Sequence, residues 1–330
     1  KEIWKNMTAR ECLTKYENMD PFGNGLKLRE LEGKELQLLK VMESKKKLNT
    51  FFMLDSIDHL IIAVEDLDLA EKNYQKVLGS QPVWRGVHEE YGTANSIFNF
   101  DNTYLELLSA NGKGIGSDLV NHILKEEGEG LSGIVFGSNH LSKLQAHLRG
   151  NGFIVDDISS GTGINLKDQA IRKWKNLFLP PELTRGLFSF VIEHTEGSLP
   201  KIEKINTDCV NKLDHAVINS PDIDDFIKIY KDVFGLRLAL DIFNDHWKKR
   251  MLFFRVNKTT LEVIEDNDLS QDRLWGLAWE VRDIEAHQKR LHSVGVDVSP
   301  IRKGLKENTL VSTVESHTHN VPTLIIQHLT

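Results

Sequence analysis

The sequence has very little cysteine and no long apolar run. Its two cysteines, Cys12 and Cys209, are too few for the disulfide framework of a small secreted domain and fit a reducing compartment. No stretch approaches the roughly 18 apolar residues that a membrane-spanning helix needs. The first residues, Lys1 to Lys5, lack the apolar core of a signal peptide. These absences lead us to expect a cytoplasmic protein.

Positive charge is not in excess either. The formal net charge is −7 at pH 7, which gives no electrostatic reason to expect a nucleic-acid partner. Hydrophobic residues make up 40% of the chain and charged residues 27%, as in ordinary soluble proteins with a core. A length of 330 residues is enough for two domains. We expect a small-molecule substrate or ligand, no nucleic acid and no membrane, and a homodimer is compatible with these totals.

Residues 1–52 differ from the rest of the chain. They are rich in charge of both signs, and Pro21 and Gly23 interrupt them. Their many acidic residues argue against an organellar transit peptide, which is poor in acids. We expect an N-terminal extension that is not native or is poorly ordered, with Met53 as the natural start. The alternative is a helical arm over residues 29–47 that packs on the barrels or on a partner.

The rest of the chain contains an internal repeat. His59 lies inside a strand-like apolar run, and His215 lies in a similar run 156 positions later. A pattern with helical period follows each run at the same offset, and it ends at Gly79 in one copy and at Gly235 in the other. Glycine at such a position is typical of a left-handed helix C-cap. The sequence therefore predicts two copies of one structural unit.

A glutamate closes each copy at a matching distance. Glu106 follows His59 by 47 residues, and Glu262 follows His215 by 47 residues. Each glutamate lies in an apolar strand-like segment, on a face shared with apolar residues. A carboxylate on the inner face of a sheet is costly unless it is paired or bound to a metal. We therefore expect the histidine and the glutamate of each copy to lie together in a metal-binding site. The alternatives are a buried histidine bonded to the backbone and a glutamate paired with an internal arginine.

Two further units of the same kind follow the first and the third. Each has a strand, a helix and a closing strand, and the polar segment Ser159 to Arg185 before the closing strand of the second unit is expected to be a loop. The expected fold is α+β, with four βαβββ units paired into two tandem barrels, because one unit cannot cover its own sheet. We expect domain one over residues 53–196 and domain two over residues 212–330.

These features resemble the vicinal oxygen chelate superfamily, which includes glyoxalase I, methylmalonyl-CoA epimerase, the extradiol dioxygenases and the bleomycin-resistance proteins. The resemblance rests on the repeat, on the capping glycines and on three motifs: Ile57-Asp58-His59, Tyr104-Leu105-Glu106-Leu107 and Phe190-Val191-Ile192-Glu193-His194. Domain one resembles the glyoxalase-like domain family in particular. The implied fold is a pair of tandem glyoxalase-like barrels.

The resemblance also implies a divalent metal ion, Zn, Fe, Mn, Ni or Mg, held by residues of the first and last strands of paired units. The implied ligands are His59, Glu106 and Glu193 in domain one, and His215, Glu262 and Gln327 in domain two. The fourth position falls on Gly133 and on Gly276, which leaves the open position that a catalytic metal needs. We expect His194 and His328, which follow the last ligands, to point outward.

The leading functional hypothesis is a metal-dependent enzyme that acts on a small oxygenated substrate by isomerase, lyase or dioxygenase chemistry. Glu193 or Glu106 would act as general base, because burial and a neighbouring carboxylate both raise a carboxyl pKa. His88 and Asn95 would contact the substrate. The alternative is a metal-free protein that binds a small molecule or sequesters a drug on the same fold. A third hypothesis is one catalytic domain beside a structural remnant.

Overall fold

The computed structural model describes residues 53–201 and 206–329. The expectations for residues 1–52 lie outside the described residues, as do residues 202–205 between the two expected domains. Within the described ranges, no helix is long and apolar enough to cross a membrane. The described residues belong to one compact unit.

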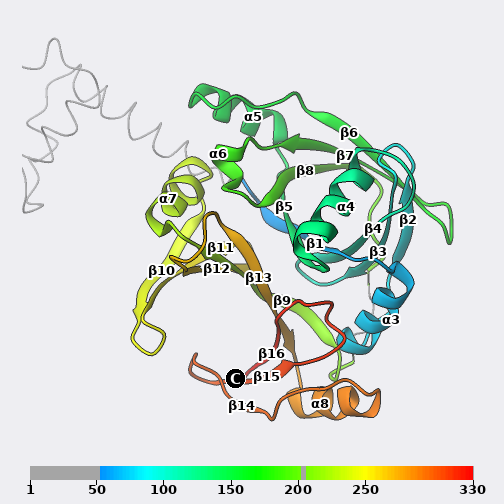
Figure 1. Cartoon of the computed structure of the whole chain (residues 1–330), viewed down its shortest axis with the longest axis vertical. Helices are drawn as coiled ribbons and strands as arrows, with labels where there is room; N and C mark the ends of the chain where they lie inside the picture. The colour runs from blue at the N-terminus through cyan, green and yellow to red at the C-terminus, as the bar shows by residue number, and fades with distance from the viewer. Residues whose placement is uncertain (1–52, 202–205, 330) are drawn as a thin grey trace, which may run out of the picture. The chain divides into compact units, whose positions relative to one another are not determined.

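The first domain is a closed barrel of eight strands, built from two βαβββ units (Figure 1). Within the barrel, β1 lies between the parallel strand β4 and the antiparallel strand β5, and the β2–β6 pair joins the two units on the other side. Helix α4 connects the units. The elements are β1 (Ser56–Ala63), α3 (Leu67–Leu78), β2 (Trp84–His88), β3 (Thr93–Asn99), β4 (Tyr104–Ala110), α4 (Ile115–Glu127), β5 (Gly130–Gly137), α5 (Leu141–Gly150), β6 (Ser159–Asn165), β7 (Ile171–Phe178), α6 (Pro181–Thr184) and β8 (Phe188–Glu196).

The second domain repeats the pair of units, but its sheet is open. The strand order is β10-β11-β12-β9-β13-β16-β15-β14, with β10 and β14 at the two edges. The edge strand β14 has only two residues, which is too short for a ladder that would close the sheet. The elements are β9 (Val210–Ser220), α7 (Ile223–Ile227), the π-helical turn η2 (Lys228–Val233), β10 (Arg237–Asn244), β11 (Lys249–Val256), β12 (Thr259–Glu265), β13 (Arg273–Val281), α8 (Ile284–Ser293), β14 (Arg302–Lys303), β15 (Thr309–Val314) and β16 (Thr323–His328). The predicted α+β fold of four βαβββ units is confirmed, with one closed barrel and one open sheet.

The polar segment before β8 is not a loop, so that prediction was wrong. It forms β6, β7 and α6, and the two strands complete the barrel. Along β7, Arg172, Trp174 and Asn176 face the barrel interior, while Lys173 between them is exposed. Two of the three inward side chains are polar, and this hid the strand, because strand recognition relies on apolar alternation.

The first helix of each repeat is bounded by the same two devices. In α3, the Asp66 carboxylate accepts hydrogen bonds from the backbone N–H groups of Asp68 and Leu69, and the helix ends at Gly79 with a φ of 76°. In the second domain, Asp222 caps α7 and Gly235 has a φ of 74°. A positive φ favours glycine, because a side chain strains the left-handed conformation. The predicted glycine cap of α3 is confirmed.

Polar contacts to α3 and α6 connect the two domains. Near the start of the second half of α3, the Tyr74 hydroxyl donates to the Thr318 carbonyl at 2.9 Å. At the end of the same helix, Arg290 of α8 donates to the carbonyl of Val77 at 2.9 Å. The Arg290 bond satisfies a carbonyl group that a helix C-terminus otherwise leaves to solvent.

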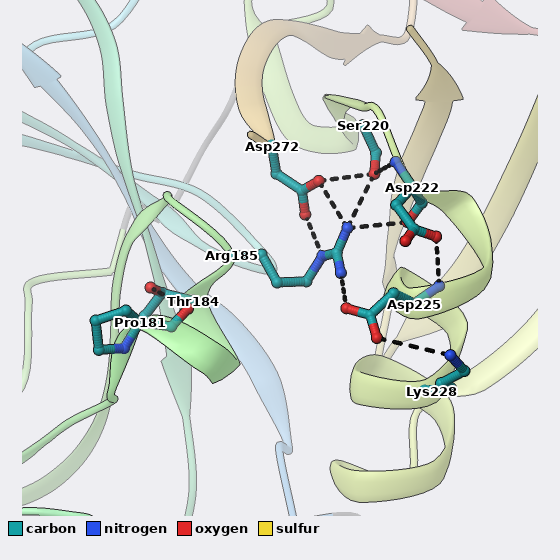
Figure 2. Close-up of polar contacts among 8 residues, drawn as sticks. All are labelled: Pro181, Thr184, Arg185, Ser220, Asp222, Asp225, Lys228 and Asp272. Atoms are coloured by element: carbon teal, nitrogen blue, oxygen red, sulfur yellow. Dashed lines mark hydrogen bonds and ion pairs between the residues drawn. The ribbon is translucent and has the colours of Figure 1, made fainter. Parts of the chain in front are cut away.

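Arg185, directly after α6, makes the most buried of these connections (Figure 2). Its Nε donates to Asp272 Oδ2 at 2.6 Å, and its other nitrogens contact the Asp225 carboxylate and the Asp222 carbonyl. Ser220 also donates to Asp272, at 2.7 Å. The Asp272 side chain is 0% exposed and that of Arg185 is 9% exposed. Burial raises the pKa of Asp272 in spite of the hydrogen bonds from Arg185 and Ser220.

His287 on α8 should make the stability of the protein depend on pH. The residue is 1% exposed, and its Nδ1–H donates to the Asp208 carbonyl at 2.8 Å. Burial, aided by the nearby Arg290, lowers its pKa from 6.5 to about 4. Between these values the unfolded chain takes up a proton at His287 and the folded chain does not. The free energy of unfolding should therefore fall as the pH drops through this window, by on the order of 3 kcal/mol.

Urea unfolding at several pH values checks this expectation. His287→Gln keeps a donor for the Asp208 carbonyl and removes the titration, so the decline in stability from pH 6.5 to pH 4 should become shallower. The matched control is His292→Gln, because His292 is exposed on the same helix. Equal pH slopes in the wild type and His287→Gln would show that this ring does not control acid stability.

Candidate functional site

His59 and Glu106 meet inside the closed barrel. Their strands, β1 and β4, are parallel neighbours, with Ile61 paired opposite Glu106. His59 Nε2 lies 3.3 Å from Glu106 Oε2, and both side chains are buried. The imidazole stacks on the ring of Tyr104, with ring centroids 4.5 Å apart. The two atoms are close without the alignment of a hydrogen bond, and at this separation they can both bind one ion.

Asp58 fixes the orientation of the His59 ring. Its Oδ1 accepts a hydrogen bond from His59 Nδ1 at 2.7 Å, and its Oδ2 accepts one from His194 Nε2 at 2.9 Å. Burial would raise the pKa of Asp58, but the hydrogen bonds from His194 and His59 outweigh it and hold the pKa well below its ordinary value. Because Asp58 accepts the hydrogen bond of Nδ1–H, a neutral His59 ring carries its lone pair on Nε2, the nitrogen nearest to Glu106. Metal-binding histidines commonly have this support.

Asn95 and His88 line the same wall, on β3 and β2. Asn95 Nδ2 donates to Glu106 Oε1 at 2.6 Å, while the buried Asn95 Oδ1 has no hydrogen-bond partner among the described residues. His88 Nδ1 lies 3.0 Å from the Thr93 hydroxyl. Burial lowers the pKa of His88, partly opposed by the charge of Glu106. The ring is therefore neutral at pH 7 and able to accept a proton.

These groups face a cavity of about 430 Å³ within the barrel. Its wall is mainly apolar, and many of its side chains come from β7 and β8 of the second unit, including Trp174, Phe188, Phe190 and Ile192. The polar side chains that line it include His59, His88, Asn95, Glu106, Arg172 and Asn176. A largely apolar cavity with a few converging polar groups is the usual form of a small-molecule site. Arg172 and Trp174 were not predicted as site residues, because both lie in the segment expected to be a loop.

Glu193 and Gln327 do not join these sites, contrary to the ligand sets implied by the resemblance. Glu193 Oε2 accepts a hydrogen bond from the Leu141 N–H at 2.8 Å, and Gln327 Oε1 accepts one from the Ile284 N–H at 2.9 Å. Each therefore caps the first turn of the helix that packs outside its sheet, α5 or α8. On β8 it is Phe190 and Ile192 that face the cavity, so alternation sends Glu193 to the outer face.

His194 and His328 lie opposite to the expected direction. Both turn toward the aspartate of the first strand, with His194 Nε2 2.9 Å from Asp58 Oδ2 and His328 Nε2 2.6 Å from Asp214 Oδ2. The expectation that they point outward was wrong, because the inward series on each last strand runs through the histidine and not through the residue before it. Each aspartate consequently connects two histidines.

The second domain repeats the histidine–glutamate pair. His215 Nε2 lies 3.4 Å from Glu262 Oε2, and Asp214 Oδ1 accepts a hydrogen bond from His215 Nδ1 at 2.7 Å. Burial would lower the pKa of His215, but the hydrogen bond to Asp214 and the charge of Glu262 raise it. Burial raises the pKa of Glu262. The pair thus has the same geometry as that of domain one, on a sheet that remains open.

A second group of possible metal ligands lies beside this pair. One ligand atom each from Asp214, Glu280 and His328 falls within 4.8 Å of the others. The Lys212 ammonium already pairs with Glu280 at 2.9 Å, which places a positive charge where a cation would bind. Gly137 occupies the position of Glu280 in domain one, opposite Ser56 on β1, so the group has no counterpart there.

Two donors of domain one fit a divalent ion, because His59 Nε2 and Glu106 Oε2 lie 3.3 Å apart. Asn95, whose Nδ2 donates to Glu106, adds a buried Oδ1 that has no partner among the described residues. Nitrogen and oxygen donors of this kind suit Zn²⁺, Mn²⁺, Fe²⁺ and related ions. In the second unit, Val135 pairs opposite His59 and Ile192 lines the cavity, so neither of these two positions supplies a metal donor. Gly133 is also enclosed by apolar atoms, since a Cβ there would lie 2.9 Å from Phe188.

Comparison with protein families decides the assignment. The profile of the "Glyoxalase-like domain" family matches residues 57–234, over half of the chain. The chain belongs to the glyoxalase-like domain family. A second profile, for the "Glyoxalase/Bleomycin resistance protein/Dioxygenase superfamily", matches residues 214–312. The predicted membership of the vicinal oxygen chelate superfamily is thereby confirmed. No curated protein matches this glyoxalase-like chain in sequence.

Solved structures share the fold of this glyoxalase-like protein at low sequence identity. A mutant of 4-hydroxymandelate synthase from Streptomyces coelicolor is 14% identical, with a TM-score of 0.58 over 83% of this chain and 92% of the other. The Mn(II)-bound glyoxalase from Novosphingobium aromaticivorans is 17% identical, with a TM-score of 0.57 over 84% of this chain and 83% of the other. A hypothetical protein from Staphylococcus aureus is 13% identical, with a TM-score of 0.57 over 83% of this chain and 98% of the other.

Proposed function

We propose that this glyoxalase-like protein is a metal-dependent enzyme and that the closed barrel of domain one carries the reaction. The observation that carries the proposal is the convergence of His59 Nε2 and Glu106 Oε2, 3.3 Å apart, in the wall of a mainly apolar cavity. The reaction class is proton transfer at a carbon next to an oxygen-bearing carbon, as in an isomerase or a lyase. A glyoxalase of the same fold is Mn(II)-bound, which supports a divalent metal as the cofactor.

His59 and Glu106 would hold the ion, with Asn95 Oδ1 beside them. When bound, a divalent ion supplies Lewis-acid stabilisation of negative charge on a substrate oxygen. Asp58 keeps the His59 ring in the tautomer that leaves Nε2 free. Asn95 Nδ2 holds Glu106 Oε1, so that Oε2 remains directed toward the histidine. The enclosing apolar side chains exclude water and strengthen each of these interactions.

His88 is the group best placed to take the substrate proton. It lines the cavity apart from the proposed ligands, and burial lowers the pKa of its ring. A neutral imidazole with a pKa near the working pH is an efficient general base. This role replaces that of Glu193, whose carboxylate caps α5 on the outer face of the barrel.

Proton exchange in D₂O tests the proposal. The protein, loaded with Mn²⁺, is incubated with small hydroxy and keto acids, and loss of the C–H signal is followed by NMR. We expect exchange with the wild type and a rate about 10²–10⁴-fold lower in His88→Gln, the range of a general base, with unchanged metal content. The rate should fall as the pH drops below the lowered pKa of His88 and stay level above 6.5. Equal rates in both proteins would rule out His88 as the base.

One observation favours a second candidate function, a metal-free binding protein. The wall contributed by β7 and β8 is mainly apolar, with Trp174, Phe178, Phe188, Phe190 and Ile192 facing the cavity. A cavity of this composition can enclose an apolar molecule without catalysis. Tight binding of such a molecule that is unaffected by EDTA, with no turnover, would favour this candidate.

A further inference from the structure

Arg172 is a buried cation without a described anionic partner. It lies on the inward face of β7 and is 6% exposed. Its guanidinium carbon is 5.5 Å from the ring centroid of Trp84 and 5.4 Å from that of Tyr104. Among the described residues it forms no ion pair, and its Nε has no hydrogen-bond partner. An arginine stays charged at any ordinary pH, so its burial without a counterion is costly.

Two acids that line a cavity together with Arg172 are already engaged. Asp58 accepts hydrogen bonds from His59 and His194, and Glu106 accepts one from Asn95 and contacts His59. The two aromatic rings attract the cation through their faces, but this attraction is worth only about 0.5–2 kcal/mol. The described part of the protein therefore supplies no anionic partner for the Arg172 guanidinium.

Arg172 has access to a ligand in the catalytic cavity. It lines the cavity of about 430 Å³ that holds His59 and Glu106, and together with Tyr104 it also lines a neighbouring cavity of about 480 Å³. Four residues further along β7 and on the same face, the buried Asn176 Oδ1 also lacks a partner among the described residues. The cavity thus presents an unpaired cation, an unpaired acceptor and a large apolar wall.

We infer that Arg172 binds the carboxylate of the substrate, and that this substrate is an organic acid with an aromatic or branched aliphatic body. The planar guanidinium matches a carboxylate, and the body would pack on Trp174, Phe188 and Phe190. The identification of the bound molecule as the substrate rests on the proposed function. Arg172 is thereby a substrate-binding residue, on a segment whose sequence gave no indication of a site.

Calorimetric titration with matched probes tests the inference. The probes are 3-phenylpropanoate and 4-methylpentanoate, each beside its neutral amide. We expect the wild type to prefer the acids, and Arg172→Met to weaken acid binding by about 30-fold or more while leaving amide binding unchanged, since a desolvated charge pair is lost. Arg172→Lys should give an intermediate loss, because it keeps the charge without the planar fork. Lys173→Met, which removes the same charge from the exposed face of β7, should change neither.

Thermal unfolding separates binding from structure. If Arg172 serves to bind a ligand and not to stabilise the fold, Arg172→Met should leave the Tm unchanged or raise it. The reason is that an apolar side chain of similar length replaces an unpaired buried charge. A large fall in Tm, or failure to fold, would show a structural partner and overturn the inference. So would equal binding of acids and amides, or no binding of the acids.

Titration with EDTA and with Mn²⁺ distinguishes this inference from the proposed function. Acid preference that persists in EDTA, in a protein that binds no Mn²⁺, would leave Arg172 as the carboxylate site and remove the metal-dependent enzyme. Normal Mn²⁺ binding without a preference for acids would support the metal-dependent enzyme and rule out Arg172 as the carboxylate site.

Discussion

Replacing Arg185 by methionine is expected to lower the free energy of unfolding by about 3–5 kcal/mol, the usual cost of breaking a buried ion pair. The variant leaves the Asp272 carboxylate, 0% exposed, with Ser220 as its remaining hydrogen-bond donor (Figure 2). Burial already raises the pKa of Asp272, and Arg185 opposes that rise. In the variant the folded state should hold the Asp272 proton to higher pH, so the loss of stability should be larger at pH 8 than at pH 5.

Chemical denaturation at both pH values measures the effect. The control is Arg250→Met, because Arg250 pairs with Asp224 and Asp241 at 2.7 Å on the surface, where such pairs contribute less than about 1 kcal/mol. The double variant Arg185→Met with Asp272→Asn should recover much of the loss, since no buried carboxylate remains unpaired. Losses of equal size in the two single variants would contradict the importance given to burial.

Glu106→Gln is expected to weaken Mn²⁺ binding by about 100-fold or more. Removing a group that only hydrogen-bonds to a metal ligand weakens metal binding by about 10–100-fold. Glu106 is a proposed ligand itself, so its loss should have at least the largest of these effects. The substitution keeps the size of the side chain and removes the charge beside His59 Nε2. Asp58→Asn should fall within the supporting range, because it disturbs only the hydrogen bond that orients His59.

Isothermal titration of metal-free protein gives these affinities. The matched control is Glu262→Gln, which alters the equivalent position, 3.4 Å from His215 Nε2, on the open sheet of domain two. We expect that variant to keep the affinity of the wild-type site in domain one. Equal losses in Glu106→Gln and Glu262→Gln would mean that the closed barrel has no special role.

Two features of the sequence made the fold and the histidine–glutamate pairs predictable. The 156-residue offset between His59 and His215 extends to the capping glycines, and duplication imposes the same geometry on both copies. The 47-residue spacing places each glutamate on the strand beside its histidine, and the structure brings each pair within 3.4 Å. Parallel neighbours with inward side chains can hardly avoid contact, so the pattern was informative before any coordinates.

The last strand of each domain could not be assigned in the same way. On β8 both faces are buried, one by the cavity and one by α5, so apolar residues occupy alternate positions on both sides and the period does not identify the inner face. Glu193 was taken as inward and His194 as outward, and the structure reverses both. Arg172 was missed because an inward charge on a barrel strand breaks the apolar alternation by which strands are recognised.

The central claim is that a divalent ion binds between His59 and Glu106 in the closed barrel. Anomalous diffraction at the Mn edge, from crystals grown with Mn²⁺, locates such an ion directly. We predict a peak within coordination distance of His59 Nε2 and Glu106 Oε2, and its absence in Glu106→Gln crystals. A peak only at Asp214, Glu280 and His328, or no peak in the barrel at all, would contradict the account.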